Sequence, residues 1–164
     1  MKKLITGLPY GLGLYAVSVD RILDLRHRVL REGLPAEKAH FDGDDELNTW
    51  HFALCLNEQP VEDYSIVACV SYMLRPYNKK SAWQLRGMAV EPKAQGHGRG
   101  ALLLESSLPV VEKDYPLPFW CNARVSAIPF YEKHGWSTVG EAFQIEDAGP
   151  HKVMVEDREF VKCL

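Results

Sequence analysis

Three glycines at alternate positions, Gly96, Gly98 and Gly100, form the stretch of this sequence with the clearest chemical meaning. They follow an apolar run that ends at Pro92 and precede an aliphatic run over 101–104, a pattern that predicts a strand, a loop and the start of a helix. Glycine has no Cβ, so the backbone of such a loop can approach a ligand closely. The first turn of a helix leaves its N–H groups unpaired and carries the positive end of the helix dipole. The pattern therefore predicts an anion-binding loop suited to a phosphate group.

The glycine spacing separates the known kinds of phosphate loop. A P-loop needs a Lys and then a Ser or Thr after its last glycine, whereas Gly100 is followed by Ala101 and Leu102. A dinucleotide fingerprint tolerates Ala101 as its last small residue, but no repeated strand–helix pattern surrounds the loop to build a parallel sheet. A nucleotide-binding redox protein is therefore the weaker alternative, and a glycine-rich turn without a ligand stays open.

A second group of residues with chemical potential lies in the segment Cys121–Trp136. One of them is Tyr131: a phenol, whose ordinary pKa is about 10, stays protonated at neutral pH and can donate a proton. The alternative is a core tyrosine that packs a short helix onto a sheet. Cys121 is expected to be a buried, reduced thiol.

The two segments together resemble the signatures of the GNAT acetyltransferase superfamily. Gln95-x-x-Gly98-x-Gly100 is similar to its pyrophosphate loop. The second segment is similar to the pattern A-x-x-F-Y-x-x-x-G-[FW], which is matched here by Ala127, Phe130, Tyr131, Gly135 and Trp136. The resemblance covers nearly the whole chain. It implies an α/β (α+β) GNAT fold, with a central mixed, mostly antiparallel twisted sheet, helices on both faces, and a splayed parallel strand pair that holds acetyl-CoA.

The resemblance also implies a reaction, the direct transfer of an acetyl group from acetyl-CoA to a primary amine of a small molecule or peptide. Tyr131 would be the general acid for the leaving thiolate, and no metal is required. The pantetheine arm would contact the strand residues Met88, Ala89 and Val90 and, across the gap, Asn122. The pyrophosphate would lie on the loop formed by Gln95, Gly96, His97, Gly98, Arg99, Gly100 and Ala101. A non-catalytic acyl-CoA-binding module with the same fold is the main alternative.

The general base is not fixed by these patterns. Some GNAT enzymes carry a Glu on the strand before the glycine loop, but 83–87 contains no carboxylate, and Glu91 is expected to face solvent. The amine could be deprotonated through water or by a residue of the last predicted hairpin, namely Glu141, Glu146 or His151. A structural role for His151 is the alternative to a catalytic one.

Two charged segments near the start of the chain have less specific patterns. Arg26 and Arg28 either line an acceptor pocket or belong to a solvated helical face. The acidic segment 41–46 lacks the ligand order of an EF-hand, so we expect a solvated acidic turn. No group of His, Cys, Asp and Glu has the spacing of a zinc site.

Elements that position these residues follow from apolar periodicity and turn signals. Strands are predicted at Leu14–Val19, Trp50–Leu56, Tyr64–Leu74, Ser81–Val90, Pro118–Asn122, Trp136–Ile145 and His151–Val155. The second, third and fourth of these form an antiparallel meander, and the fifth pairs in parallel with the fourth, because a helix connects them. Helices are predicted at Asp20–Arg31, with a further turn within Leu34–His40, and at Arg99–Leu108, ended or kinked by Pro109. A short helix is capped by Ser126, with Pro129 in its first turn and Gly135 after its end. Met1–Gly13 receives no assignment.

Composition limits the classes of function. The 164 residues predict one domain, 1–164, with 46% hydrophobic residues and a net charge of −3, which gives no electrostatic basis for binding nucleic acid or an anionic membrane. No apolar run has the length of a membrane span or a signal peptide. Four cysteines without C-x-x-C spacing, Cys163 among them, are expected to be reduced thiols. We therefore expect a cytoplasmic protein, and the resemblance leaves a homodimer open.

Overall fold

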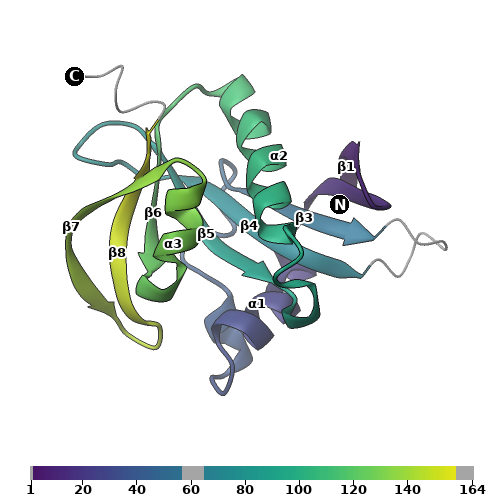
Figure 1. Cartoon of the computed structure of the whole chain (residues 1–164), viewed down its shortest axis with the longest axis horizontal. Helices are drawn as coiled ribbons and strands as arrows, with labels where there is room; N and C mark the ends of the chain where they lie inside the picture. Colours follow the sequence, from purple (N-terminus) through teal and green to yellow (C-terminus); the bar gives the residue numbers. More distant parts are fainter. Residues whose placement is uncertain (1, 57–64, 158–164) are drawn as a thin grey trace.

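The computed structural model describes residues 2–56 and 65–157. Eight strands form one sheet in the order β1-β2-β3-β4-β5-β6-β8-β7 (Figure 1). Their bounds are β1 Lys2–Leu8, β2 Leu12–Val17, β3 Trp50–Leu56, β4 Ile66–Leu74, β5 Trp83–Val90, β6 Phe119–Arg124, β7 Trp136–Ile145 and β8 Gly149–Glu156. Only the β5–β6 pair is parallel among these strands. The predicted mixed, mostly antiparallel sheet is therefore confirmed, while Tyr64 and Cys163 lie outside the described residues.

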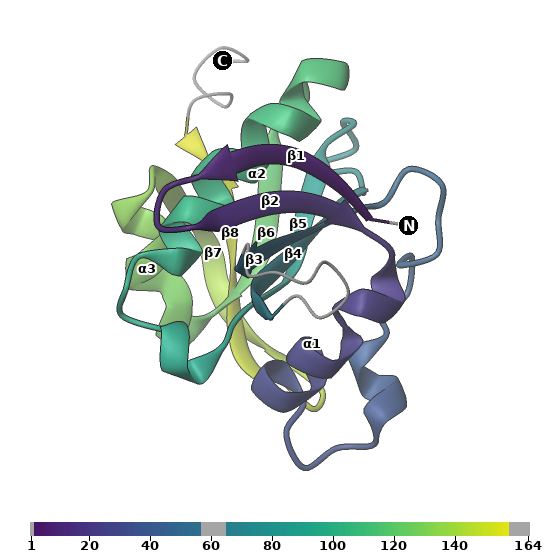
Figure 2. The same ribbon diagram turned by 90° about the vertical axis from the view of Figure 1, so that its right-hand side faces the viewer.

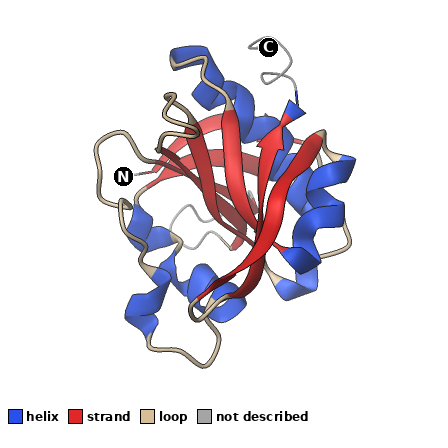
Figure 3. Ribbon diagram, turned by 90° about the vertical axis from the view of Figure 1, so that its left-hand side faces the viewer, coloured by secondary structure: helices blue, strands red, loops and turns tan. Residues whose placement is uncertain are grey.

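Helices cover both faces of this sheet, as predicted (Figures 2 and 3). Successive residues of a strand are buried in two different cores, one on each face of the sheet. Phe52 and Leu54 of β3 pack with α2 (Arg99–Asp114), whereas Ala53 and Cys55 pack on the side of α1 (Leu23–Leu30). The short helix α3 (Ile128–Lys133) contributes Tyr131 to the α2 side. A strand buried on both faces reads as an almost continuous apolar run, which is why β3 and β4 were predictable.

The parallel pair β5–β6 separates along its length. Residues pair from Trp83 with Phe119 to Leu85 with Cys121, and beyond that point the two strands continue without pairing (Figure 1). A β-bulge in β5 occurs at the same place, because three steps from Arg86 to Ala89 face only two steps on β4. A bulge bends its strand and increases the local twist, so β5 turns away from β6 there.

Within Met1–Gly13, which the sequence left unassigned, Lys2–Leu8 form β1, 9–11 form a turn, and β2 begins at Leu12. Tyr10 and Gly11 both have positive φ, 62° and 67°, and the N–H of Leu12 donates to the carbonyl of Pro9 at 3.4 Å to close the turn. β2 begins at Leu12 and not at Leu14, and Val19 already belongs to a short 3-10 turn. The predicted first strand was therefore displaced by two residues.

Helix α2 was predicted to be ended or kinked by Pro109; it continues through Pro109 to Asp114, so Pro109 does not end it. Proline removes the bond to the carbonyl of Glu105, but both residues are exposed, and water can hydrate that carbonyl. The helix is held on the sheet by its buried side, which comprises Leu103, Leu104, Leu108 and Val111.

Ser126 does not cap α3, contrary to prediction. It lies inside a 3-10 turn, Val125–Ala127, and its side chain makes no capping bond; the backbone N–H of Ile128 instead bonds to the carbonyl of Val125. Pro129 in the first turn of α3 and Gly135 just after it, at φ 77°, are as predicted. No helix in the described part of the chain has both the length and the apolarity of a membrane span.

Candidate active site

A cavity of about 430 Å³ opens where β5 and β6 diverge. Its walls bring together residues that are far apart in sequence: Met88 of β5, Asn122 of β6, Tyr131 of α3 and His151 of β8. Met88 and Asn122 were predicted to contact the pantetheine arm of acetyl-CoA, and Tyr131 was predicted to donate a proton to the leaving thiolate. The fold therefore places the candidate acid and two candidate contact residues around one space.

Tyr131 lies at the inner wall of this cavity and is only 6% exposed. Its hydroxyl donates to the sulfur of Met88 at 3.6 Å, and its ring packs against Phe130 and Trp136 at centroid distances of 5.1 and 5.5 Å. Burial raises the pKa of Tyr131 well above its ordinary value near 10. The phenol therefore keeps its proton at neutral pH, and its only hydrogen-bond acceptor in the described residues is a thioether, a weak one.

The glycine loop lies between the end of β5 and the first turn of α2. Gly96 and Gly98 have φ of 75° and 72°, the left-handed region that favours glycine, and a Cβ at either would meet nothing within 4 Å. Gly100 is needed for a different reason, since its Cβ would lie 3.3 Å from the ring of Phe130 and 3.4 Å from Met88. The loop thus presents open backbone to solvent while α2 packs closely against α3.

Hydrogen bonds within the loop fix its shape. The amide of Gln95 donates to the carbonyl of Val90 at 3.1 Å, and Nδ1 of His97 bonds to the carbonyl of Gln95 at 2.8 Å. No acidic residue occupies the first turn of α2, and Arg99 there packs over the ring of Tyr10 at 5.2 Å. The unpaired N–H groups of this helix end therefore suit a phosphate, and neither a carboxylate nor a cap side chain blocks them.

The remaining predicted contact residues lie along the open edge of β5 and at the start of α2. Ala89 and Val90 pair with Cys69 and Ala68 of β4, and they follow the last residue of β5 that pairs with β6. Ala101 is half-buried in the first turn of α2. The loop residues do not line the cavity itself, so the structure brings the predicted set together as a cavity plus an adjoining loop.

His151 alone among the three predicted base candidates lines the cavity. Its Nδ1 donates to the carbonyl of Gly149 at 2.8 Å, which leaves Nε2 with its lone pair. Burial, with smaller contributions from Arg124 and Arg31, lowers the pKa of His151. Glu141 and Glu146 are both exposed and are absent from the cavity wall.

Comparison with known proteins agrees with this geometry. The family profile of the acetyltransferase (GNAT) domain matches residues 63–154. The chain belongs to the GNAT acetyltransferase family. A Bacillus subtilis relative, the uncharacterized N-acetyltransferase YitI, is 28% identical over 139 residues, which cover 84% of this chain and 91% of the relative.

Solved GNAT structures share the fold at low sequence identity. Escherichia coli ElaA superposes with a TM-score of 0.68 at 18% identity and covers 89% of this chain and 99% of its own. An aminoglycoside 6'-N-acetyltransferase complexed with coenzyme A superposes with a TM-score of 0.60 at 15% identity, covering 84% and 88% of the two chains. These similarities support the GNAT fold described above.

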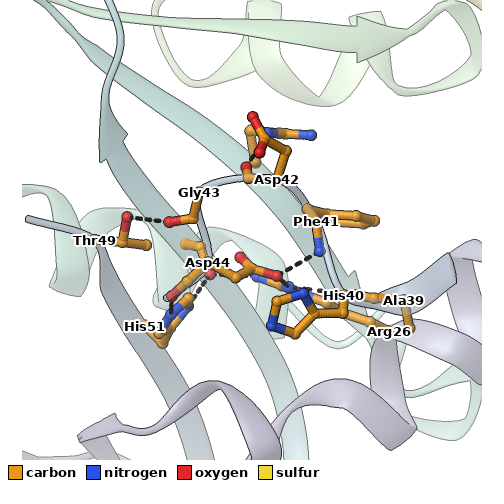
Figure 4. Close-up of polar contacts among 12 residues, drawn as sticks. Arg26, Ala39, His40, Phe41, Asp42, Gly43, Asp44, Thr49 and His51 are labelled. Carbon is orange, nitrogen blue, oxygen red and sulfur yellow. Dashed lines mark hydrogen bonds and ion pairs between the residues drawn. The ribbon is translucent and has the colours of Figure 1, made fainter. Parts of the chain in front are cut away.

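Arg26 of this GNAT chain is buried completely, so both interpretations drawn from its sequence position, a pocket-lining side chain or a solvated one, were wrong. Its Nη1 donates to the carboxylate of Asp44 at 2.6 Å (Figure 4). Its Nη2 donates to the hydroxyl of Ser71. Asp44 also accepts the N–H of Phe41 at 2.7 Å. A partial signal was present, because Arg26 follows the buried Ile22 by four residues and so shares its helical face.

The buried pair extends into a polar chain that includes His51. Nε2 of His51 donates to the carbonyl of Asp44 at 2.9 Å, and Nδ1 accepts from Ser71 at 2.5 Å. Burial lowers the pKa of His51, and the neutral ring fits both bonds. The expected solvated acidic turn was therefore wrong for Asp44, although Asp42, Asp45 and Glu46 are exposed.

Arg28 has the solvated position that one of the two interpretations gave it. It is exposed and pairs with Asp24 and Glu91, each at 2.9 Å. Glu91 was expected to face solvent, but its side chain, which pairs with Arg28, is only 26% exposed.

Several cavity residues were missed by the sequence. The cavity is also lined by residues from the C-cap of α1, two strands and a loop, namely Arg31, Phe41, Gln84, Arg86 and Arg124. Nothing in their local spacing distinguishes them from surface residues. Only the tertiary structure brings them together.

Proposed function

We propose that this chain is a single-domain N-acetyltransferase that transfers the acetyl group of acetyl-CoA directly to a primary amine, with Tyr131 as general acid. The observation that carries the proposal is the cavity at the divergence of β5 and β6, where the neutral hydroxyl of Tyr131 points to Met88. Membership of the GNAT acetyltransferase family supports the reaction class.

The residues present fit coenzyme A. The open loop over 95–101 offers unpaired N–H groups to a pyrophosphate. Beyond Leu85, the β6-facing edge of β5 pairs with no strand among residues 2–56 and 65–157, so the backbone of Met88, Ala89 and Val90 is available to a pantetheine arm. Asn122 would donate or accept a hydrogen bond from the opposite side. One structural neighbour was determined with coenzyme A bound.

The catalytic work would fall to two side chains. Tyr131 would hold its proton until negative charge develops on the sulfur of coenzyme A, and would then donate to it. Nε2 of His151 would accept the proton of the amine, directly or through a water molecule, because its lowered pKa keeps the ring neutral at pH 7. Burial around both groups would exclude bulk water from the reacting atoms.

Thermal unfolding with and without acetyl-CoA tests the binding half of the proposal. A ligand that binds only the native state at 100 times its dissociation constant adds about 2.7 kcal/mol, which should raise the midpoint of a chain of this size by roughly 5–10 °C. Gly98→Glu should abolish the shift, since a carboxylate would repel the pyrophosphate. Gly33→Glu is the matched control, because Gly33 also has positive φ, 78°, and open space, and lies outside the loop.

Two outcomes would contradict the cofactor assignment: no shift in the wild type at saturating acetyl-CoA, or an equal shift in wild type and Gly98→Glu. Amine-dependent release of free thiol from acetyl-CoA tests the catalytic half. Binding without any such release over a broad amine panel would favour the non-catalytic acyl-CoA-binding module instead.

A further inference from the structure

The wall of the cavity carries a concentration of positive charge. Arg31 at the end of α1, Arg86 of β5 and Arg124 of β6 all line it. Its lining among the described residues includes no Asp or Glu. A cavity that binds an amine for its charge would be expected to present carboxylates, and this one presents guanidinium groups.

Two of these guanidinium groups converge on one atom. Nη1 of Arg31 and Nη2 of Arg124 both donate to the carbonyl oxygen of Leu30, at 3.0 and 2.7 Å. Arg86 donates to another backbone carbonyl, that of Asp42, at 2.9 Å. None of the three forms an ion pair within residues 2–56 and 65–157. Each guanidinium has five N–H donors, so most of them remain available to a ligand.

Phe41 holds two of the arginines in place without neutralising them. The guanidinium carbons of Arg31 and Arg86 lie 5.1 and 5.2 Å from the centre of its ring. An aromatic ring attracts a cation more weakly than a carboxylate does. The ring therefore orients the two forks at the cavity wall and leaves their charge uncompensated.

Nearby carboxylates are already bound or exposed. Asp147 pairs with Lys38 at 2.9 Å, and Asp44 pairs with Arg26 at 2.6 Å. The side chain of Asp42 is fully exposed. Burial is the largest cause that lowers the pKa of both Arg31 and Arg86. Arg124 lowers the pKa of Arg31 further, whereas Asp147 acts in the opposite direction on Arg31 and Asp44 on Arg86. An anion bound in the cavity would counteract the lowering of these two pKa values.

We propose that the acceptor is a small amine that also carries a carboxylate, which Arg31 and Arg124 bind while Arg86 completes the cationic wall. The proposal rests on the acetyltransferase function above and specifies its substrate class. Planar guanidinium forks match a carboxylate in charge and shape. The same wall disfavours polycationic acceptors, and a volume of about 430 Å³, shared with the acetyl group, restricts the acceptor to a small molecule.

Matched acceptor sets test the charge preference directly. Each set contains an amino acid, its carboxamide and its decarboxylated amine, with thiol release as the assay. We expect the carboxylate-bearing member to have the highest kcat/KM in its set. An aminoalkyl phosphate is included in the panel, and its preference over the matched amino acid would overturn the carboxylate assignment.

Variants connect the preference to the arginines. Arg124→Gln should raise KM for the amino acid by about 10- to 100-fold, as expected for loss of a charged hydrogen bond, with a smaller change in kcat and unchanged affinity for acetyl-CoA. Arg124→Lys should restore part of the loss, because it keeps the charge and loses the fork. Arg21→Gln is the control, since Arg21 is exposed and absent from the cavity wall.

The outcomes separate the two proposals. Failure of acetyl-CoA to bind removes the proposed function itself. If acetyl-CoA binds, equal or better use of carboxamides or decarboxylated amines overturns the subsite alone, as does an unchanged KM in Arg124→Gln. Should no amine react, thermal shifts of the coenzyme A-loaded protein decide: stabilisation by amino acids that requires Arg124 supports the subsite, and no stabilisation by any of them overturns it.

Discussion

Replacing Asp44 with Asn should destabilise this protein severely. The side chains of Arg26 and Asp44 have no exposed surface, and their charged atoms lie 2.6 Å apart. Asn has the same shape and can still accept the N–H of Phe41, but it leaves the guanidinium of Arg26 in the core without a counter-charge. Breaking a buried ion pair in this way costs about 3–5 kcal/mol. That is a large part of the roughly 5–15 kcal/mol that holds a typical domain folded.

Urea unfolding with linear extrapolation measures the loss. Asp42→Asn is the matched control, because it makes the same change two residues away on a fully exposed side chain and should alter the free energy of unfolding by at most about 0.5 kcal/mol. The double variant Arg26→Met/Asp44→Asn should be more stable than Asp44→Asn alone, since it leaves no unpaired charge in the core.

A loss below about 1 kcal/mol in Asp44→Asn would refute this reasoning, because it would lie far under the cost of an unpaired buried charge. So would a double variant whose loss equals the sum of the two single losses, because residues in one network must couple. Either result would mean that water reaches Arg26 or that another group compensates its charge.

Other predictions concern the cavity, the bulge and pH. Tyr131→Phe should lower kcat by about 10²- to 10⁴-fold with little change in the thermal midpoint, since the lost bond is a long contact to a sulfur; an unchanged kcat would exclude Tyr131 as the acid. Gly87→Ala should cost about 1–3 kcal/mol of unfolding free energy, because φ is 59° and the new Cβ would lie 2.7 Å from Nε of Arg26; Gly33→Ala, with similar φ and open space, should cost less. Burial lowers the pKa of both His51 and His151, so the unfolded chain takes up protons first, and the free energy of unfolding should fall as pH drops below about 6.5, by at most about 1.4 kcal/mol per pH unit for each histidine. A flat urea stability between pH 7.5 and 5.5 would contradict this. Burial raises the pKa of Tyr131, so a pH–kcat profile should show no loss from phenol ionisation below about pH 10; a loss that Tyr131→Phe removes would contradict it.

Most of the successful sequence predictions rest on residues that are close together in the chain. The glycine loop and the Tyr131 segment are each contained in fewer than twenty consecutive residues, so their geometry follows from neighbours along the chain. β3 and β4 were predictable because a strand buried on both faces is an apolar run. The strand and loop residues that were predicted to bind the pantetheine arm and the pyrophosphate of coenzyme A remain predictions, because no contact in the structure tests them.

The features that the sequence could not predict depend on contacts between residues far apart in the chain. β1 contains two lysines and a glycine and owes its conformation to pairing with β2. Arg26 resembles a surface residue until Asp44, 18 positions later, is placed beside it. Arg31, Arg86 and Arg124 come from three elements and meet only through the sheet order. Such contacts leave no periodic signal.

The bulge at Gly87 explains why one strand can serve both halves of the site. Consecutive residues of a regular strand point to opposite faces, yet every residue from Gln84 to Met88 lines the cavity. The extra residue in β5 rotates the strand where β6 leaves it, so that Arg86 lines the cavity at the proposed acceptor subsite and Met88 contacts Tyr131. The buried guanidinium of Arg26 packs against Gly87 and is itself fixed by Asp44. It follows that Gly87→Ala should change the acceptor KM and the affinity for acetyl-CoA together, whereas Arg124→Gln should change only the first. If Gly87→Ala left both constants unaltered, the bulge would be incidental to the site.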